Sequence, residues 1–244
     1  MLGAIHLTGT LINAGTVLAG TTAGVLLGDR LPERMRETVM HALGLVTLAV
    51  GIDEALAAFQ PPLSTLTRGS VLMILGSVLV GGIVGEAIRI EDMLERAGDA
   101  LKRRFGAGQS RFTEGFVVAS LVFCVGPLTI LGSIQDGVHG NYQLLAIKSM
   151  LDGFAALAFA SALGWGVGFS VVTILLYQGG LSLAASGVAH ALHAVEIAAI
   201  TASGGLLIIG IGLRLLDVQR VRVANLLPSL VLAPVAMWLF QTFR

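Results

Sequence analysis

Charged side chains are scarce in this chain. Only 12% of its 244 residues are Asp, Glu, Lys or Arg, whereas 55% are hydrophobic and the mean hydropathy is +0.87. A soluble domain of this size needs more polar surface than that to cover its core. The composition therefore excludes a soluble globular protein and predicts an integral membrane protein whose main partner is the lipid bilayer.

The chain also lacks the residues of common catalytic and redox sites. Cys124 is its only cysteine, which excludes an intramolecular disulfide and is typical of a small packing residue. There is no P-loop, dinucleotide-binding, HExxH or GxSxG motif. A formal net charge of +0 without a basic domain gives no basis for nucleic-acid binding. We therefore expect no enzyme activity, no cofactor and no nucleic-acid partner.

What the chain has is a series of long apolar runs separated by short segments that hold most of the charge. A helix needs about 20 residues to cross a hydrocarbon core of about 30 Å, and these runs do not alternate as barrel strands do. We predict an all-α polytopic bundle of about eight spans, forming one transmembrane domain over 1–244. The predicted spans are 8–28, 40–58, 69–89, 112–134, 148–164, 169–187, 195–215 and 223–242.

Most basic residues fall on alternate loops between these spans. The first, third and seventh loops, together with the span ends next to them, hold twelve of the fifteen Lys and Arg residues, and short basic loops stay in the cytoplasm. Both termini are therefore predicted to be extracytoplasmic. No basic residue precedes Arg30, so the first span lacks the charged region of a cleavable signal peptide.

Two segments leave alternatives open. One helix over 148–187 would be about 60 Å long, so the glycine-rich stretch at 164–168 must break it, into either two full spans or a re-entrant hairpin. The charged loop at 90–111 has apolar residues at helical spacing and predicts an amphipathic helix on the cytoplasmic surface. It is either a coupling element or, as we favour, a polar loop at the lipid headgroups.

Two pairs of segments resemble each other. Residues 15–24 (GTVLAGTTAG) resemble 76–85 (GSVLVGGIVG), and 44–52 (GLVTLAVGI) resemble 205–213 (GLLIIGIGL). The second pair runs in opposite directions in the predicted topology, which is typical of inverted repeats in secondary transporters, although chance similarity is an equal alternative. Glycines at four-residue spacing predict close helix packing within the chain, with a homo-oligomer as the alternative.

Polar residues inside the predicted spans carry the functional signal, because an unpaired polar group is costly in hydrocarbon. Gly-Pro in the fourth span and Gln-Gly-Gly in the sixth predict discontinuous helices, whose freed ends bind ions; a kink without any ligand is the alternative. Asp152, four residues after Lys148, either carries a proton or cation or only completes an ion pair. The predicted substrate- or ion-binding residues are Asn13, Gly126, Pro127, Gln135, Asp136, Asp152, Gln178, Gly179 and Asn225.

One group approaches the spacing of metal ligands. His190, His193 and Glu196 are three residues apart, but they match no zinc motif and three-residue spacing drifts around a helix. We expect polar loop residues here and no metal.

Several segments together resemble a known family. They are GTLINAGTVLAG at 9–20, CVGPLTILGSIQDG at 124–137, LLYQGG at 175–180, GGLLIIGIGLRLL at 204–216 and VANLLPSLVLAP at 223–234. The chain is similar over essentially its whole length to the YdfK/YqgA family of bacterial inner-membrane proteins. This resemblance implies a multi-pass protein of the bacterial inner membrane and supplies no substrate and no functional residue.

Our leading functional hypothesis is a transporter of a small solute or ion. It is motivated by helix breakers and amide and carboxylate groups that gather in an otherwise apolar chain. The alternative is a membrane scaffold or sensor that does not transport and acts through the cytoplasmic loop at 90–111.

Overall fold

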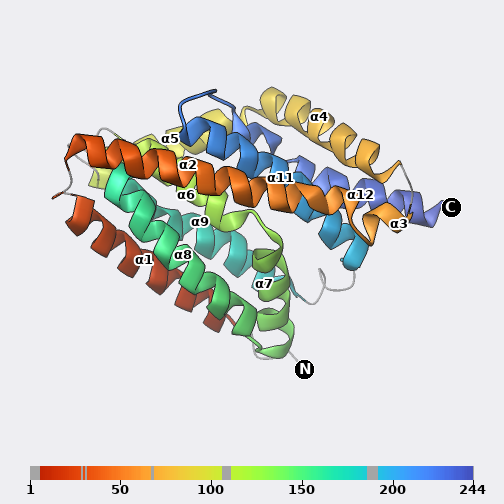
Figure 1. The fold of residues 1–244 in the computed structure, drawn as a ribbon. Helices are drawn as coiled ribbons and strands as arrows, with labels where there is room; N and C mark the ends of the chain where they lie inside the picture. The colour runs from red at the N-terminus through yellow and green to blue at the C-terminus, as the bar shows by residue number, and fades with distance from the viewer. Residues whose placement is uncertain are drawn as a thin grey trace. The chain divides into compact units, whose positions relative to one another are not determined.

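The structure is a computed structural model that describes residues 6–28, 30, 32–66, 69–105, 111–185 and 192–243. Within these residues the chain is helical and forms no β-strand, which confirms the predicted all-α fold (Figure 1). The helices are α1 Thr8–Gly28, α2 Glu33–Ala55, η1 Leu56–Phe59, α3 Leu63–Leu66, α4 Ser70–Ile88, α5 Ile90–Phe105, α6 Phe112–Cys124, α7 Pro127–His139, α8 Gln143–Leu163, α9 Gly166–Leu183, α11 Ala194–Leu215, η2 Val223–Leu226 and α12 Ser229–Thr242.

The number of candidate membrane spans agrees with the prediction of about eight. Seven helical segments in the described part of the chain are long and apolar enough to cross a membrane, or up to eight if the bent α6–α7 pair forms one more. α8 and α9 are separate helices on either side of Gly164 and Trp165, and each has the length of a span. The chain is therefore a multi-pass membrane protein.

The discontinuity predicted in the fourth span is present. α6 and α7 are bent by 64° at a short break. Gly126 has φ 135°, a backbone conformation that residues with a side chain rarely adopt. Pro127 is the first residue of α7, where the missing N–H leaves no helical hydrogen bond unmade. The Gly-Pro pair thus ends one helix and begins the next in a new direction.

The discontinuity predicted in the sixth span is wrong. α9 continues through Gln178, Gly179 and Gly180 without interruption. A glycine in a helix interior costs only about 1 kcal/mol, which tertiary packing readily outweighs. Gln178 and Gly179 are both buried, with Gly179 beside Thr10 of α1, so packing keeps this segment helical.

The loop predicted at 90–111 begins with a helix, as expected. α5 has acidic residues in its first turn and basic residues in its last, which complements the helix dipole. Residues 106–110 lie outside the described residues. The second half of α5 packs against α6. Gly98 lies next to Phe116, and Asp99 accepts a hydrogen bond from the Thr113 hydroxyl (2.6 Å).

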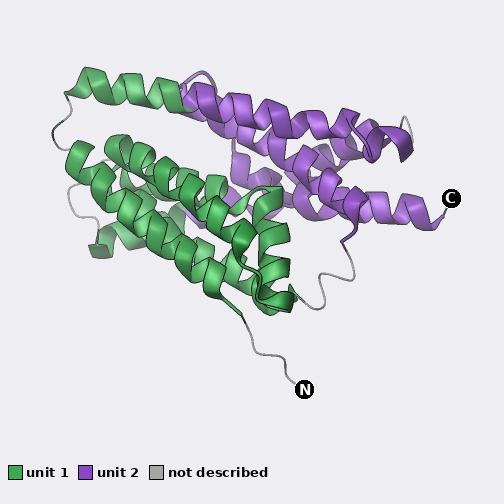
Figure 2. Ribbon diagram, turned by 60° about the horizontal axis from the view of Figure 1, so that its bottom comes forward, with its two compact units in different colours: residues 1–43, 95–190 green, residues 44–94, 191–244 purple. Residues whose placement is uncertain are grey.

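The chain folds into two compact units, each assembled from two separate segments (Figure 2). Unit 1 comprises residues 1–43 and 95–190, and unit 2 comprises residues 44–94 and 191–244. The single transmembrane domain over 1–244 stays a prediction.

Glycines bring α1 and α8 into backbone contact in unit 1. A Cβ atom added to Gly20, Gly24 or Gly28 would lie 2.1 to 2.4 Å from a carbonyl oxygen of α8. Real Cβ atoms do not approach this closely, so only glycine fits at these three positions. The four-residue spacing therefore serves packing within the chain.

In unit 2, α4 uses glycine in the same way. A Cβ on Gly85 would lie 1.9 Å from the carbonyl oxygen of Asn225, and one on Gly81 would lie 2.6 Å from the backbone nitrogen of Ser229. Gly20 and Gly24 of the first similar segment thus have the same packing role as Gly81 and Gly85 of the second. The inverted repeat stays a prediction.

We predict that Gly24→Ala destabilises the protein. Its Cβ would lie 2.2 Å from the Leu157 carbonyl oxygen, so the two helices must separate at a cost of about 1–3 kcal/mol. Thermal unfolding of the detergent-purified protein measures the effect. Gly15→Ala is the control on the same helix, because nothing lies within 4 Å of its Cβ. Equal unfolding temperatures for the two variants would contradict the close contact.

Candidate functional site

The interior of unit 1 contains a network of buried polar side chains from three helices. Asn13 of α1 donates through Nδ2 to Asp152 Oδ2 of α8 (2.9 Å) and to Gln178 Oε1 of α9 (3.0 Å). Asp152 Oδ2 also accepts a hydrogen bond from the ammonium group of Lys148, one turn earlier on α8. All four side chains are buried, Asn13 and Gln178 completely. We call these four residues the polar network.

The broken span explains why a lysine is buried here. In a continuous helix, the Phe123 carbonyl oxygen would accept a hydrogen bond from residue 127, but Pro127 has no N–H. Lys148 Nζ donates to this oxygen instead (2.8 Å), and the Thr129 hydroxyl approaches it at 3.4 Å. The break at Gly126-Pro127 thus frees a carbonyl that binds a cation, and that cation is the chain's own lysine.

The network continues toward the start of α1. Gln178 Nε2 donates to the Thr10 hydroxyl (3.2 Å), and Thr10 is also the nearest neighbour of a Cβ placed on Gly179, at 3.7 Å. The Asn13 Oδ1 atom is buried and has no hydrogen-bond partner among the described residues. The network therefore holds one positive charge, one negative charge and one acceptor that remains available.

Unit 1 contains a second buried carboxyl group, that of Asp136. Asp136 of α7 accepts the backbone N–H of Gly9 through Oδ2 (2.9 Å), near the N-terminus of α1. Its neighbour Gln135 is half-buried, and no hydrogen bond in the described part of the chain joins its side chain to the network. Of these two predicted site residues, only Asp136 is thus bonded to one of the helices that form the network.

Asn225 belongs to a different cluster, in unit 2. Its Oδ1 accepts the backbone N–H of Glu91 (2.7 Å), and its Nδ2 donates to Glu86 Oε2 (2.6 Å). Glu91 in turn accepts the N–H of Ala224 (2.8 Å) and pairs with Arg214. These bonds fasten η2 to the junction of α4 and α5, which is a structural task.

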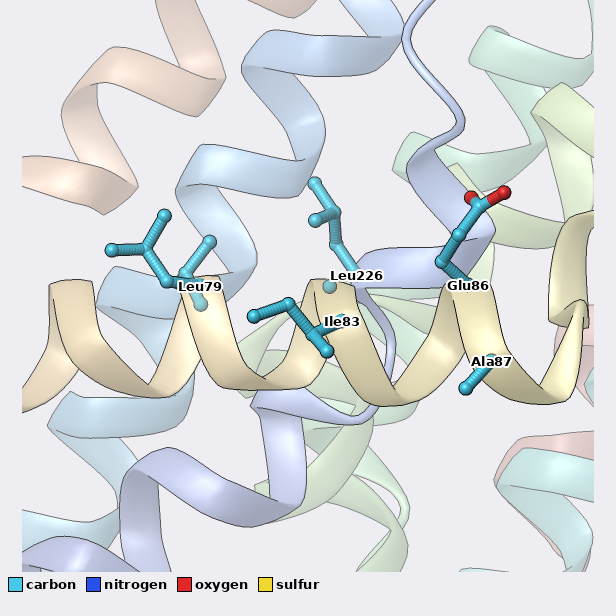
Figure 3. Close-up of a pocket in the computed structure, with 7 residues that line it drawn as sticks. Leu79, Ile83, Glu86, Ala87 and Leu226 are labelled. Atoms are coloured by element: carbon cyan, nitrogen blue, oxygen red, sulfur yellow. The ribbon is translucent and has the colours of Figure 1, made fainter.

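Unit 2 also has a groove of about 480 Å³ along α4 (Figure 3). It is lined by Leu79, Ile83, Ala87 and Leu226, with Glu86 as its one charged lining residue. Leu79 is 70% exposed and Ile83 is 71% exposed. Such an open apolar groove matches acyl chains better than a polar solute.

No metal is expected at His190, His193 and Glu196. The structure describes His193 and Glu196, whereas His190 lies outside the described residues. Glu196 Oε2 accepts the N–H of His193 (3.0 Å), and Glu196 Oε1 accepts a bond from Gln241 (2.8 Å). Both oxygens of the carboxylate are therefore engaged, the first in a capping box that begins α11. Among the described residues no group of three or more His, Cys, Asp or Glu could hold a metal ion.

Two participants were missed from the sequence, Thr10 and the Phe123 carbonyl. A signal was present for both. Thr10 precedes Asn13 by three residues and therefore lies on the same helix face. Phe123 precedes Pro127 by four residues, so its carbonyl is the one that the proline leaves unpaired.

Comparison with known proteins gives a consistent picture. The family model described as "Protein of unknown function (DUF554)" matches residues 8–238. The "Uncharacterized membrane protein YdfK" of Bacillus subtilis (strain 168) is 31% identical over 235 residues, 96% of this chain and 97% of the relative. The "Uncharacterized protein YqgA" of Escherichia coli (strain K12) is 31% identical over 230 residues, 92% of this chain and 94% of the relative. No solved structure matches the chain.

We predict that Lys148→Met destabilises the protein more than the double change Lys148→Met with Asp152→Asn. The single change leaves a buried carboxylate without its cation, which typically costs about 3–5 kcal/mol, whereas the double change removes both charges. The measurement is thermal unfolding in detergent. Glu114→Gln, in the more exposed Arg111–Glu114 pair of the same unit, is the control and should change little. A double variant less stable than the single one would refute the pairing.

Proposed function

Because the chain belongs to the family described as "Protein of unknown function (DUF554)", which assigns no substrate, we propose a function from its geometry: a transporter of a small solute or ion. The binding site is the polar network of Asn13, Lys148, Asp152 and Gln178. One observation carries this proposal: the buried Lys148–Asp152 pair is bonded to Asn13, which is bonded in turn to the buried Gln178.

Stability alone does not account for such a pair. Removing two charges from water costs several kcal/mol per ion, and apolar residues of similar volume often replace a buried ion pair without loss of stability. Ionisable residues within membrane-spanning helices mark ion or substrate paths by default. The bond to the Phe123 carbonyl explains where Lys148 lies, and in this proposal a ligand that exchanges with Lys148 or Asp152 explains why both charges are kept in the interior.

The chemistry of the network allows that exchange. A cationic group can replace the Lys148 ammonium on Asp152, and an anionic group can draw Lys148 away from it. Asn13 and Gln178 each have both donors and acceptors, so they can follow either change. The Asn13 Oδ1 atom, which has no partner among the described residues, provides a first contact for a donor on the solute.

The broken span supplies an element that could move. α6 and α7 meet at Gly126, and the freed Phe123 carbonyl contacts Lys148 directly. A ligand that displaces Lys148 therefore changes the bonding of the break itself. In this proposal, α7 reorients about Gly126 during transport, as half-helices do in transporters with discontinuous spans.

The setting we propose is the bacterial inner membrane, with both termini extracytoplasmic. The distribution of basic residues on the first, third and seventh loops supports this orientation. α5 would then lie on the cytoplasmic side.

The alternative function, a scaffold or sensor that acts through this cytoplasmic segment, has one observation in its favour. α5 is strongly amphipathic, yet Met93 and Phe105 expose more than half of their side-chain surface. A scaffold predicts that deleting residues 91–105 removes a partner interaction while no solute crosses the membrane.

We predict a saturable, ligand-specific rise in unfolding temperature when the purified protein is screened against ions, metals, amino acids and carboxylates at constant sodium concentration. A ligand that binds only the folded state stabilises it by mass action. Gln178→Leu should abolish the rise, because it removes the bonds to Asn13 and Thr10 at similar volume. The matched control is Gln143→Leu, at the exposed start of α8, which should respond as wild type.

A ligand found in this way is then tested for uptake into proteoliposomes, where Asp152→Asn should lose saturable flux. The proposal fails if no ligand shifts the wild-type protein and no flux occurs. It also fails at these residues if Gln178→Leu and Asp152→Asn keep the full response.

A further inference from the structure

Three buried oxygen atoms on α7 and α9, two helices in close contact, have no hydrogen-bond partner among the described residues. They are Asp136 Oδ1 and Ser133 Oγ of α7, and Ser182 Oγ of α9. All three side chains are at least 97% buried, with exposed fractions of 0%, 0% and 3%. Buried polar groups normally have a hydrogen-bond partner, so three such oxygen atoms without one need an explanation.

The Ser133 and Ser182 hydroxyl groups lack a hydrogen bond that several other serines in helices of this chain make. Ser77, Ser149 and Ser203 each donate to the carbonyl four residues earlier in their own helix. That local bond is the usual solution for a serine inside a helix. Ser133 and Ser182 do not make it, so their hydroxyl groups remain available to a ligand.

The packing brings these groups to one place in unit 1. Ser133 and Asp136 are three residues apart on α7 and lie on one helix face. The next residue on that face, Gly137, contacts α9 so closely that a Cβ on it would lie 2.1 Å from the Ser182 carbonyl oxygen. Asp136 also accepts a hydrogen bond from the backbone of Gly9, next to Thr10 on α1. Thr10 accepts a hydrogen bond from Gln178, which lies one turn before Ser182 on α9.

Three helix ends surround this group of oxygen atoms. The Gly9 N–H belongs to the first turn of α1, whose positive end stabilises a negative charge on Asp136. Asp136 and Ser182 lie in the last turns of α7 and α9, whose negative ends favour a positive charge. Within the described residues no basic side chain forms an ion pair with Asp136, and Lys148 is engaged by Asp152.

We propose that Asp136, Ser133 and Ser182 bind a monovalent alkali cation, Na⁺, through these three oxygen atoms. Hard cations prefer carboxylate, hydroxyl and carbonyl oxygens. One carboxylate balances one positive charge, whereas a divalent ion would leave a net charge in an apolar interior. The site shares α1 and α9 with the polar network, so an ion here is placed to couple with a solute there.

The test is the unfolding temperature of the purified full-length protein in NaCl against choline chloride at constant ionic strength. Wild type should be stabilised saturably by Na⁺, by roughly 5 °C. Asp136→Asn should lose the response. Ser133→Ala and Ser182→Ala should each raise the half-saturating Na⁺ concentration by roughly tenfold or more, because each removes a ligand to a charged group.

Ser229→Ala is the matched control. Ser229 is also fully buried with a hydroxyl that has no partner among the described residues, but it belongs to unit 2 and not to the unit that contains Asp136, so its half-saturation should equal that of wild type. Direct binding of radioactive ²²Na⁺ to the same proteins gives a readout that does not depend on stability, and the serine variants keep the test open if Asp136→Asn does not fold.

The site does not exist if Na⁺ neither stabilises nor binds the wild-type protein, or if the Asp136 and serine variants bind it like wild type. The result is separate from the proposed transport. Na⁺ binding that depends on Asp136 would stand even if no solute were transported, and transport that depends on Gln178 would stand without it.

Discussion

The interior of unit 1 depends on how one backbone carbonyl is satisfied. Pro127 cannot donate to the Phe123 oxygen, and an unpaired carbonyl is expensive in an apolar interior. Lys148 takes that place and brings a positive charge into the protein. The charge requires Asp152, the carboxylate engages Asn13, and Asn13 engages Gln178. A single proline thus accounts, step by step, for a chain of polar partners on four helices.

This chain of partners closes only because α1 lies unusually near α8. Gly20, Gly24 and Gly28 allow backbone contact between the two helices, and the same approach brings the short Asn13 side chain within reach of Asp152. A wider separation would leave room for larger side chains and would break the bond. The glycines and the polar residues are therefore parts of one arrangement, although they lie on different turns of α1.

The sequence predicted the features that depend on neighbouring residues and missed those that depend on distant ones. Gly126-Pro127 breaks the helix because of its own backbone chemistry, and this was predicted. Gln178-Gly179 stays helical because buried neighbours outweigh the weak preference of glycine, and this was not. Asn13, Asp152 and Gln178 were each selected as buried polar groups, but Asn13 lies 139 and 165 residues from its partners, and no local pattern encodes those pairings. For the same reason, the bonds of Asn225 to Glu86 and Glu91 were not foreseen.

The interleaving of the two units bears on how the protein is made. Unit 2 combines residues 44–94 with residues 191–244, and the Gly81–Gly85 face of α4 packs against Asn225 and Ser229. During synthesis, α4 therefore enters the membrane long before its partner has been translated. The glycine face of α4 is therefore covered by lipid or by the insertion machinery while residues 95–190, the second segment of unit 1, are synthesised. Unit 2 can therefore be assembled only after residues 191–244 have been synthesised.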